Sequence, residues 1–319
     1  MFKLTEDRKV KGTPLAKVVM QTIADVMDTD EKVVMLEADL GSASSSNIVE
    51  KAHPERYVQC GIAEADMVGI AAGLSVKGFK PFIHTFGPFA TRRVYDQLYL
   101  SGAYAHNTIN VYGSDPGFTV GPNGGTHTTW EDVALMRAMP TAVVTDAADA
   151  VQLEWIVREF AKMEGIHYVR ANRKDVRNVY APGSTFELGK GNVLTEGKDV
   201  LIITAGQLVS DALDAAEQLE AEGISTEVID MFTIKPIDKE LILSEVKGKK
   251  AVVAFENHSI IGGLGSAVAE VLAENCIAVP FRRHGCMDQF GQVGTPDWLQ
   301  KEFKLTAADL IETVKGLLK

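Results

Sequence analysis

The chain of 319 residues has little cysteine and no long uninterrupted apolar run. Its three cysteines, Cys60, Cys276 and Cys286, form neither a CxxC pair nor an even set, which favours buried reduced thiols over a disulfide framework. No apolar run reaches the roughly 18 residues that a membrane span needs, and no basic and apolar leader opens the chain. We therefore expect a cytoplasmic protein that binds no membrane.

Positive charge is also scarce. The chain has 32 Lys and Arg residues against 43 Asp and Glu residues, a formal net charge of -11, so nucleic acid is not expected as a partner. The seven histidines form no HxxxH or HxH pair, so we expect no metal site in this chain. The stretch "ENHSIIGGLGSAVAE" fails the dinucleotide-binding fingerprint, and no GxxxxGK[ST] phosphate loop occurs.

Short apolar runs alternate with amphipathic stretches along the whole chain. Such continuous runs suit parallel strands that are buried on both faces. The expected strands cover residues 32–39, 56–61, 80–86, 107–113, 141–147, 166–172, 200–206, 225–231, 251–257 and 277–283. We therefore predict an α/β fold with two doubly wound domains, a mostly parallel one over 1–185 and a smaller one over 186–319. A linker with a short hairpin is expected at about 174–198.

Several polar residues follow expected strands, at the ends where open α/β sheets bind ligands. Glu64 follows the strand at 56–61, and "HTFGPF" at 84–89 ends the next one. The loop 112–132 is long and holds five glycines, which suits close approach of its backbone to a ligand. His127 in this loop could face that ligand, or it could cap or pack the loop instead. These loops could converge on one site.

The aromatic and basic residues near these strand ends leave alternatives open. Phe86 and Phe89 could form a stacking platform, although aromatic residues at strand ends more often belong to the core. Arg170 and Arg173 lie at the end of a strand, where they could hold a phosphate or another anion, or could simply be exposed.

Five motifs occur in an order that resembles one enzyme family. They are "EADLGSASSSN", "RYVQCGIAEADMVGIAAGLS", "HTFGPFATRRVYDQL", "TVGPNGGTHTTWEDVALMRAMP" and "IHYVRANRKD". Together they resemble the carboxyl-terminal half of a transketolase, with a pyrimidine-binding domain over about 10–185 and a transketolase carboxyl-terminal domain over about 195–317. The resemblance implies a thiamine-diphosphate enzyme of carbohydrate metabolism that moves a two-carbon ketol unit from a ketose, expected to be a phosphate, to an aldose.

The resemblance also implies which residues bind the cofactor. In thiamine-diphosphate enzymes a glutamate at the position of Glu64 hydrogen-bonds N1′ of the aminopyrimidine and helps the cofactor to deprotonate its own thiazolium carbon. Glu64 is therefore expected to be catalytic. Phe86 and Phe89 match positions that pack against the aminopyrimidine, and Asp39 and Ile62 are expected near the same cofactor.

A substrate site follows from the same resemblance. His127 matches a histidine that contacts substrate oxygens, so it is the second expected catalytic residue, where it could stabilise a developing alkoxide. Arg173 matches an arginine that grips the sugar phosphate, and Arg170 is the second choice for that role.

The chain departs from the family at four substrate positions, one of them near Pro14, where the family has a phosphate-contacting arginine. Asn123 stands where the family has an acidic residue, and Thr128 stands where it has a glutamine. Ser114 or Asp115 stands where it has another histidine, so both are candidate substrate contacts. Because discrimination between substrates depends on such polar contacts, the motifs do not name the sugar.

The family's diphosphate-binding motif, GDG followed further along by Asn, is absent from this sequence. We therefore expect a split enzyme in which a separate, N-terminal-type subunit carries that motif. Thiamine diphosphate would be shared between the two, with Mg²⁺ (or Ca²⁺) held mainly by the partner. The resemblance implies a heterotetramer with two copies of each subunit, in which this chain also forms a homodimer and each active site lies at a subunit interface.

Three other functions remain open. The beta subunit of a 2-oxoacid dehydrogenase shares this layout and the glutamate, although "GPNGGTH" is closer to the transketolase loop. Deoxyxylulose-phosphate synthase is suggested by "VYDQL", but that enzyme is normally one long chain. A catalytically silent regulatory or binding subunit belongs to a different class, and the retained Glu64 and His127 argue against it.

Overall fold

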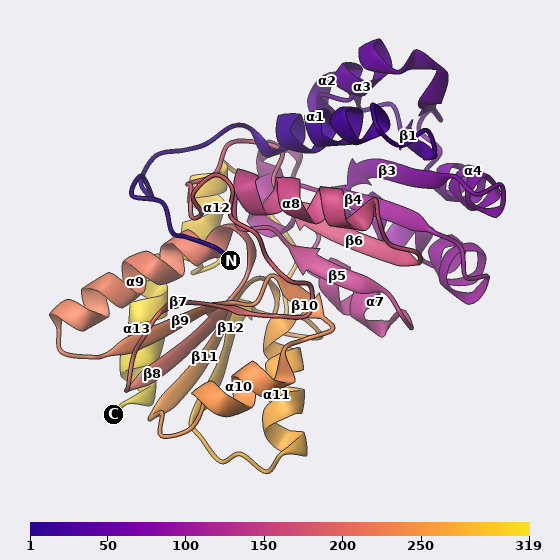
Figure 1. The fold of residues 1–319 in the computed structure, drawn as a ribbon. Helices are drawn as coiled ribbons and strands as arrows, with labels where there is room; N and C mark the ends of the chain where they lie inside the picture. Colours follow the sequence, from indigo (N-terminus) through magenta and orange to yellow (C-terminus); the bar gives the residue numbers. More distant parts are fainter.

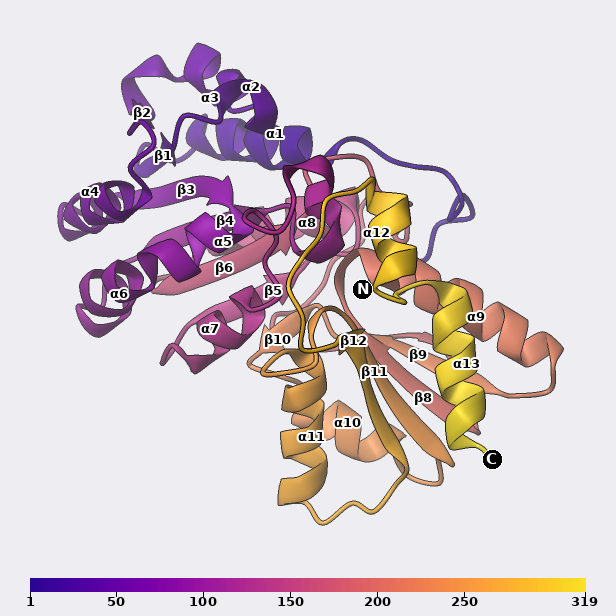
Figure 2. The ribbon, with the colours of Figure 1, turned by 180° about the vertical axis from the view of Figure 1, so that it is seen from behind.

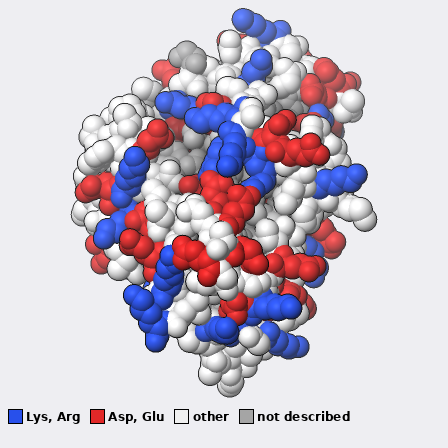
Figure 3. All heavy atoms as spheres, turned by 90° about the vertical axis from the view of Figure 1, so that its left-hand side faces the viewer, with Lys and Arg blue, Asp and Glu red and all other residues white. Residues whose placement is uncertain are grey.

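The computed structural model describes the backbone of residues 1–319 and every side chain except that of Ser42. Two β-sheets form its centre, and helices cover both faces of each sheet (Figure 1). The predicted α/β class, with two doubly wound and mostly parallel sheets, is confirmed. On the face drawn in Figure 3, the basic side chains lie among acidic ones.

The first sheet has seven strands. They are β1 (Val33–Glu37), β2 (Tyr57–Gln59), β3 (Lys80–Phe86), β4 (Ile109–Ser114), β5 (Val143–Asp146), β6 (Ile166–Ala171) and β10 (Thr233–Lys235). Their order across the sheet is β10, β5, β6, β4, β3, β1, β2, and only β10 runs antiparallel to its neighbour. β1, β4 and β6 are buried along their whole length, as expected for apolar runs covered by helices on both faces.

The second sheet has five strands. They are β7 (Asn192–Thr195), β8 (Val200–Thr204), β9 (Thr226–Asp230), β11 (Ala251–Ser259) and β12 (Phe281–Cys286). Their order is β12, β11, β8, β9, β7, with β7 antiparallel to β9. The hairpin predicted within 174–198 is wrong, because β7 pairs with β9 and the residues before it form bridges with Leu4 and Lys11.

Helices pack on both faces of each sheet (Figures 1 and 2). Those of the first domain are α1 (Leu15–Met27), α2 (Gly41–Ser44), α3 (Asn47–Ala52), α4 (Glu64–Val76), α5 (Gly87–Ala90), α6 (Tyr95–Gln97), α7 (Asp132–Ala138) and α8 (Ala150–Phe160). Those of the second are α9 (Val209–Ala221), α10 (Lys239–Glu245), α11 (Leu264–Glu274), α12 (Pro296–Glu302) and α13 (Ala307–Leu317). A π-helix covers Leu98–Tyr104, and 3-10 turns cover Pro54–Arg56, Arg92–Val94, Gly117–Asn123 and Gly206–Leu208.

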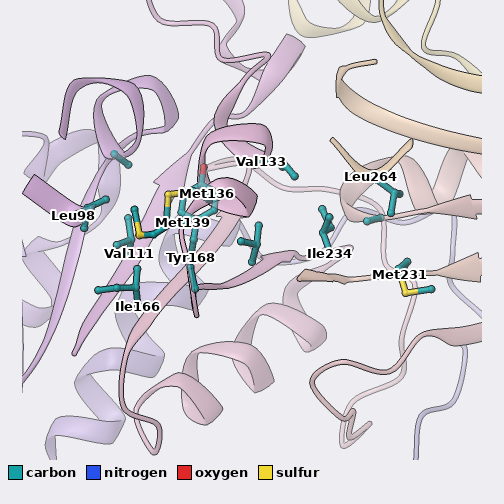
Figure 4. Close-up of a cluster of buried hydrophobic side chains, with 14 of the residues drawn as sticks. Leu98, Val111, Val133, Met136, Met139, Ile166, Tyr168, Met231, Ile234 and Leu264 are labelled. Carbon is teal, nitrogen blue, oxygen red and sulfur yellow. The ribbon is translucent and has the colours of Figure 1, made fainter. Parts of the chain in front are cut away.

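One hydrophobic cluster joins the two sheets. It runs from Val111 and Ile166 in the first sheet to Met231 and Leu264 in the second domain (Figure 4). Ile234, in β10, lies between these groups, because β10 follows β9 in the chain but pairs with β5 of the first sheet. The two domains therefore share one hydrophobic core. The domain boundary between residues 185 and 186 stays a sequence-based prediction.

Arg170 ties the two domains together. It lies inside β6 and is only 1% exposed. Its Nε donates to Asp132 Oδ2 at 2.7 Å, its Nη1 to Asp146 Oδ2 at 2.9 Å and its Nη2 to the carbonyl of Asn257 at 3.0 Å. Burial raises the pKa of Asp146 to about 6, against the opposing effect of Arg170. The predicted role of Arg170 as a second substrate-anion ligand is corrected here, because buried partners already use its donors.

A second buried polar group links β1, β3 and β4. His84 Nδ1 lies 3.1 and 3.0 Å from the two carboxylate oxygens of Glu37, and its Nε2 lies 3.0 Å from Ser114 Oγ. All three side chains are 0% exposed. The residue types are those of a nucleophilic triad, but a substrate cannot reach a fully buried hydroxyl. The predicted direct contact between Ser114 and substrate is therefore corrected to a buried contact with His84.

The Arg170 cluster predicts a large loss of stability when its cation is removed. Arg170→Met keeps an apolar stem but leaves Asp132 and Asp146 buried without a counter-charge. The free energy of unfolding in urea should fall by about 3–5 kcal/mol. Arg158→Met is the matched control, because Arg158 pairs with Asp25 and Glu154 at the surface. It should cost less than about 1 kcal/mol. Equal effects of the two substitutions would contradict the structural role of Arg170.

The Glu37 and His84 pair predicts a pH-dependent effect. Burial raises the pKa of Glu37, but the charge of His84 and hydrogen bonds from His84 and Ser44 outweigh burial and hold it below its ordinary value of 4.5. The pair therefore stabilises the fold above about pH 4.5 and loses its contribution as the pH falls through the lowered pKa. His84→Phe should cost about 3–5 kcal/mol near pH 7, measured by urea unfolding, because Glu37 is left buried and unpaired.

The same substitution measured near pH 4 should cost less, since the wild-type protein has begun to lose this contribution. Glu37→Leu combined with His84→Phe is the control, because replacing both partners by apolar side chains should restore most of the stability. A cost of His84→Phe that does not depend on pH would rule out the ion pair as its cause.

Candidate active site

The carboxyl ends of adjacent strands bring most of the predicted residues together. Arg173 follows β6, Asp115 follows β4, Phe86 ends β3, Asp39 follows β1 and Glu64 follows β2. Since the sheet runs in the order β6, β4, β3, β1, β2, these five positions lie side by side along one edge. This is the edge where open α/β sheets bind ligands.

Glu64 is the first residue of α4 and is 4% exposed. The turn before it is fixed by Gln59, whose side-chain oxygen accepts hydrogen bonds from the backbone of Gly61 at 3.0 Å and of Asp39 at 2.8 Å. A carboxylate in the first turn of a helix is stabilised by the positive end of the helix dipole. Arg93 donates from Nη1 to Glu64 Oε1 at 2.7 Å and supplies a counter-charge.

Three rings form an aromatic cluster next to this ion pair. The His127 ring lies edge-to-face with Phe86 and Phe89, at centroid distances of 5.5 and 5.1 Å. The guanidinium carbon of Arg93 lies 3.8 Å from the centroid of Phe89, and that of Arg173 lies 4.6 Å from the centroid of Phe86. Phe86 is buried, whereas Phe89 and His127 are partly exposed. The cluster therefore offers aromatic surface to a ligand beside a carboxylate.

The second domain holds the loop that carries His127. Asn257, in β11, accepts a hydrogen bond from the backbone N–H of Phe118 at 3.2 Å and donates one to the carbonyl of Pro116 at 3.0 Å. A Cβ at Gly125 would come within 2.6 Å of the backbone of the segment between β12 and α12. Close packing by the second domain thus explains why this loop is rich in glycine.

The surroundings of His127 favour the neutral form of its imidazole. Its Nδ1 lies 2.9 Å from the hydroxyl of Thr126. Burial, and to a lesser extent the charge of Arg93, lower the pKa of His127 below its ordinary value. When Nδ1 accepts from the Thr126 hydroxyl, Nε2 carries the proton and can donate to a substrate oxygen.

Asp115 orients Arg173. Asp115 is 2% exposed, and it accepts from the Arg173 backbone N–H at 2.8 Å and from its Nε at 2.5 Å. Burial raises the pKa of Asp115, although Arg173 opposes that shift. Asp115 has a φ of 55°, in the left-handed region that costs a residue with a side chain some strain. Asp115 thus uses the Nε of Arg173 and not its two Nη groups.

The remaining predicted residues lie at the rim. Asp39 and Asn123 are exposed, and Ile62 is 77% exposed. Thr128 is buried and donates to the carbonyl of Gly124 at 3.0 Å within its own loop. The roles predicted for the three rim residues in cofactor or substrate binding stay predictions.

Sequence reasoning missed Arg93, His84 and Glu37. Arg93 lies inside the motif "HTFGPFATRRVYDQL", but nothing in the spacing of "TRRV" tells which of its two arginines turns towards Glu64. The clue to His84 and Glu37 was present, since each is a charged or polar residue within an apolar strand and must find a buried partner there.

A cavity of about 600 Å³ lies elsewhere, beside β12 in the second domain. Its lining mixes basic and acidic side chains, Arg282, Arg283, Lys304, Asp309 and Glu312 among them. We place the functional site at the sheet edge, where the carboxylate, the rings and the imidazole converge. Among the described residues, no helix is both long and apolar enough to cross a membrane.

Family models match most of the chain. The model described as "Transketolase, pyrimidine binding domain" matches residues 11–179, and the one described as "Transketolase, C-terminal domain" matches residues 189–310. These matches bear out the resemblance predicted from the motifs.

Two relatives and one solved structure match this chain over most of its length and most of their own. The chain is 45% identical over 282 residues to the "6-deoxy-6-sulfo-D-fructose transketolase subunit SqwH" of Clostridium sp. (strain MSTE9), with 88% of this chain and 87% of that protein covered. It is 38% identical over 301 residues to a "Putative transketolase C-terminal section" of Methanocaldococcus jannaschii, with 94% of both covered. A solved structure described as "Split gene transketolase, inactive beta4 tetramer" superposes with a TM-score of 0.89 at 40% identity, over 96% of this chain and 99% of that one. The chain therefore belongs to the transketolase family, as the carboxyl-terminal half of a split transketolase.

Proposed function

We propose that this chain forms the aminopyrimidine-binding half of a thiamine-diphosphate site, in an enzyme that moves a two-carbon ketol unit from a ketose to an aldose. The observation that carries the proposal is the buried carboxylate of Glu64 beside the partly exposed ring of Phe89, in a chain of the transketolase family. Thiamine diphosphate supplies the electron sink for the transferred unit when it is bound. This chain supplies orientation and proton positioning.

The side chains at the sheet edge fit an aminopyrimidine. A planar ring with polar edge atoms can stack on Phe89 or Phe86 and share a proton with the carboxylate of Glu64. In that arrangement Glu64 holds the proton at the ring nitrogen N1′, and the two phenylalanines fix the plane of the ring. His127 donates from Nε2 to the substrate oxygen that gains negative charge.

The same side chains do not fit a diphosphate. Arg93 is already paired with the buried carboxylate of Glu64, which leaves Arg173 as a single guanidinium for the two phosphates. Among the described residues, no group of three or more His, Cys, Asp and Glu side chains could hold a metal ion. We therefore assign the diphosphate and its Mg²⁺ (or Ca²⁺) to a partner subunit with a GDG motif. The similar split-gene transketolase, which is inactive as a β4 tetramer, supports the need for such a partner.

The donor ketose is proposed to carry an anionic group. Asp115 holds the Nε of Arg173, so the two Nη groups remain for a bidentate contact with an anion. Both a phosphate and a sulfonate present suitable oxygens. The name of the relative from Clostridium, a 6-deoxy-6-sulfo-D-fructose transketolase subunit, supports including a sulfonate alongside the sugar phosphates.

Self-association of this chain is proposed to use α4. The exposed positions along this helix include Asp66, Gly69, Gly73 and Val76, and Val76 is 71% exposed. A Cβ added at Gly69 or Gly73 would meet nothing within 4 Å. Figure 2 shows α4 at the outer margin of the first domain. Glycines spaced four apart let two helices approach closely, which supports a homodimer within a tetramer of two copies of each subunit.

Replacing Glu64 should nearly abolish transfer. The chain is combined with a GDG-containing partner, thiamine diphosphate and Mg²⁺, and two-carbon transfer from ketose phosphates and ketose sulfonates to aldoses is followed. Glu64→Gln should lower the rate about 10²- to 10⁴-fold, because an amide cannot exchange a proton with N1′. Glu31→Gln, at an exposed glutamate just before β1, is the matched control and should leave the rate unchanged.

Three outcomes would contradict the proposal. Release of CO₂ from a 2-oxoacid, in place of ketol transfer, would assign the chain to a dehydrogenase. An unchanged rate for Glu64→Gln would remove its catalytic role. Equal turnover of ketoses by the chain alone would remove the need for a partner.

The α4 proposal predicts that a bulky side chain blocks self-association. Gly73→Leu should lower the molar mass of the isolated chain, measured by light scattering after size-exclusion chromatography, because the leucine fills the space between two packed helices. Gly316→Leu is the matched control, since Gly316 is another exposed helical glycine with nothing near its Cβ position. The same drop in mass for both variants, or for neither, would refute α4 as the interface.

A further inference from the structure

Arg93 occupies the place where a cofactor ring would have to bind. Its Nη1 donates to Glu64 Oε1 at 2.7 Å, and its guanidinium carbon lies 3.8 Å from the centroid of the Phe89 ring. A single planar, nitrogen-bearing group therefore stacks on the aromatic face and hydrogen-bonds the buried carboxylate at the same time. These are the two contacts that the proposed function gives to the aminopyrimidine.

We infer that Arg93 occupies the aminopyrimidine position while no cofactor is bound. The cofactor has to displace Arg93 from Glu64 and Phe89 before it can bind there. The inference rests on the proposed function. A guanidinium is flat and carries N–H donors at its edge, so it satisfies Glu64 and Phe89 in the way that an aminopyrimidine would. Both groups cannot use Glu64 Oε1 and the same ring face together.

The ion pair with Arg93 stabilises the buried carboxylate of Glu64 in the isolated chain. Glu64 is only 4% exposed, and a buried carboxylate without a partner is costly. Arg93 supplies the partner while the cofactor is absent. Its own side chain is 44% exposed, so it can swing into solvent without losing a buried position.

The contacts of Arg93 are weak enough to be broken. An ion pair with a half-exposed partner contributes little, and a cation over a phenylalanine ring at an exposed site adds a similar small amount. The free energy needed to displace Arg93 should therefore reduce the apparent affinity for the cofactor by about 3- to 30-fold. Only the fraction of molecules in which Arg93 has left Glu64 can bind the cofactor.

Its neighbour Arg92 provides an internal comparison. Arg92 is 51% exposed and donates to Glu131 at 2.8 Å, away from Glu64. The two arginines are adjacent in sequence, carry the same charge and are similarly exposed. Only Arg93 competes for the carboxylate, so neutralising each in turn separates competition from a general loss of positive charge.

The test measures cofactor binding and not turnover. The chain is reconstituted with its GDG-containing partner, and the dissociation constant of thiamine diphosphate is measured by isothermal titration calorimetry with Mg²⁺ present. Arg93→Gln should bind thiamine diphosphate about 3- to 30-fold more tightly than the wild type, because no guanidinium has to be displaced. Arg92→Gln should bind it with the wild-type affinity.

Each outcome decides between the two proposals. Equal or weaker binding by Arg93→Gln, in a wild-type complex that does bind thiamine diphosphate, overturns the inference and leaves the proposed function standing. The same gain for both variants also overturns it, since charge alone would explain the change. A complex that binds no thiamine diphosphate in any form overturns the proposed function and the inference together.

Discussion

The buried guanidinium of Arg170 determines where the two sheets and the active-site loop lie. Without it, the carboxylates of Asp132 and Asp146 would be buried with no counter-charge, which is costly. Asp132 begins α7, directly after the loop that carries His127. Arg170 also binds the carbonyl of Asn257, whose side chain holds the start of the same loop. One buried cation therefore fixes both ends of the segment that presents the imidazole.

The second domain shapes the site without supplying a predicted catalytic residue. It provides Asn257 for the His127 loop, the close packing at Gly125, and β10 as an edge strand of the first sheet. This strand couples the two domains, because it follows β9 in the chain, pairs with β5 of the first sheet and places Ile234 in the hydrophobic cluster that joins them. The position of His127 relative to Phe86 and Phe89 thus depends on residues that lie far along the chain.

Much of the fold could be predicted from the sequence, since ten apolar runs of strand length each became a strand. The strands β7 and β10 could not be predicted, because each is short and is stabilised only by a partner distant in sequence. At the site, the sequence alone allows either Arg170 or Arg173 to hold an anion, with Arg173 as the first choice. The difference is that Arg170 lies inside the buried strand and must be neutralised there, whereas Arg173 lies beyond its end. Ser114 is a similar case, because its partner His84 lies on the neighbouring strand, 30 residues earlier in the chain.

The charges at the sheet edge cancel in pairs while the chain is alone. Glu64 is matched by Arg93 and Asp115 by Arg173, so an approaching anion meets little net positive charge. If the aminopyrimidine takes over the carboxylate of Glu64, Arg93 loses its partner and the edge gains one unpaired positive charge next to Phe89. A phosphate or sulfonate on the substrate would then be attracted more strongly than before, because the released guanidinium no longer has a carboxylate beside it to cancel its charge. Binding of the cofactor would in this way prepare the site for an anionic sugar.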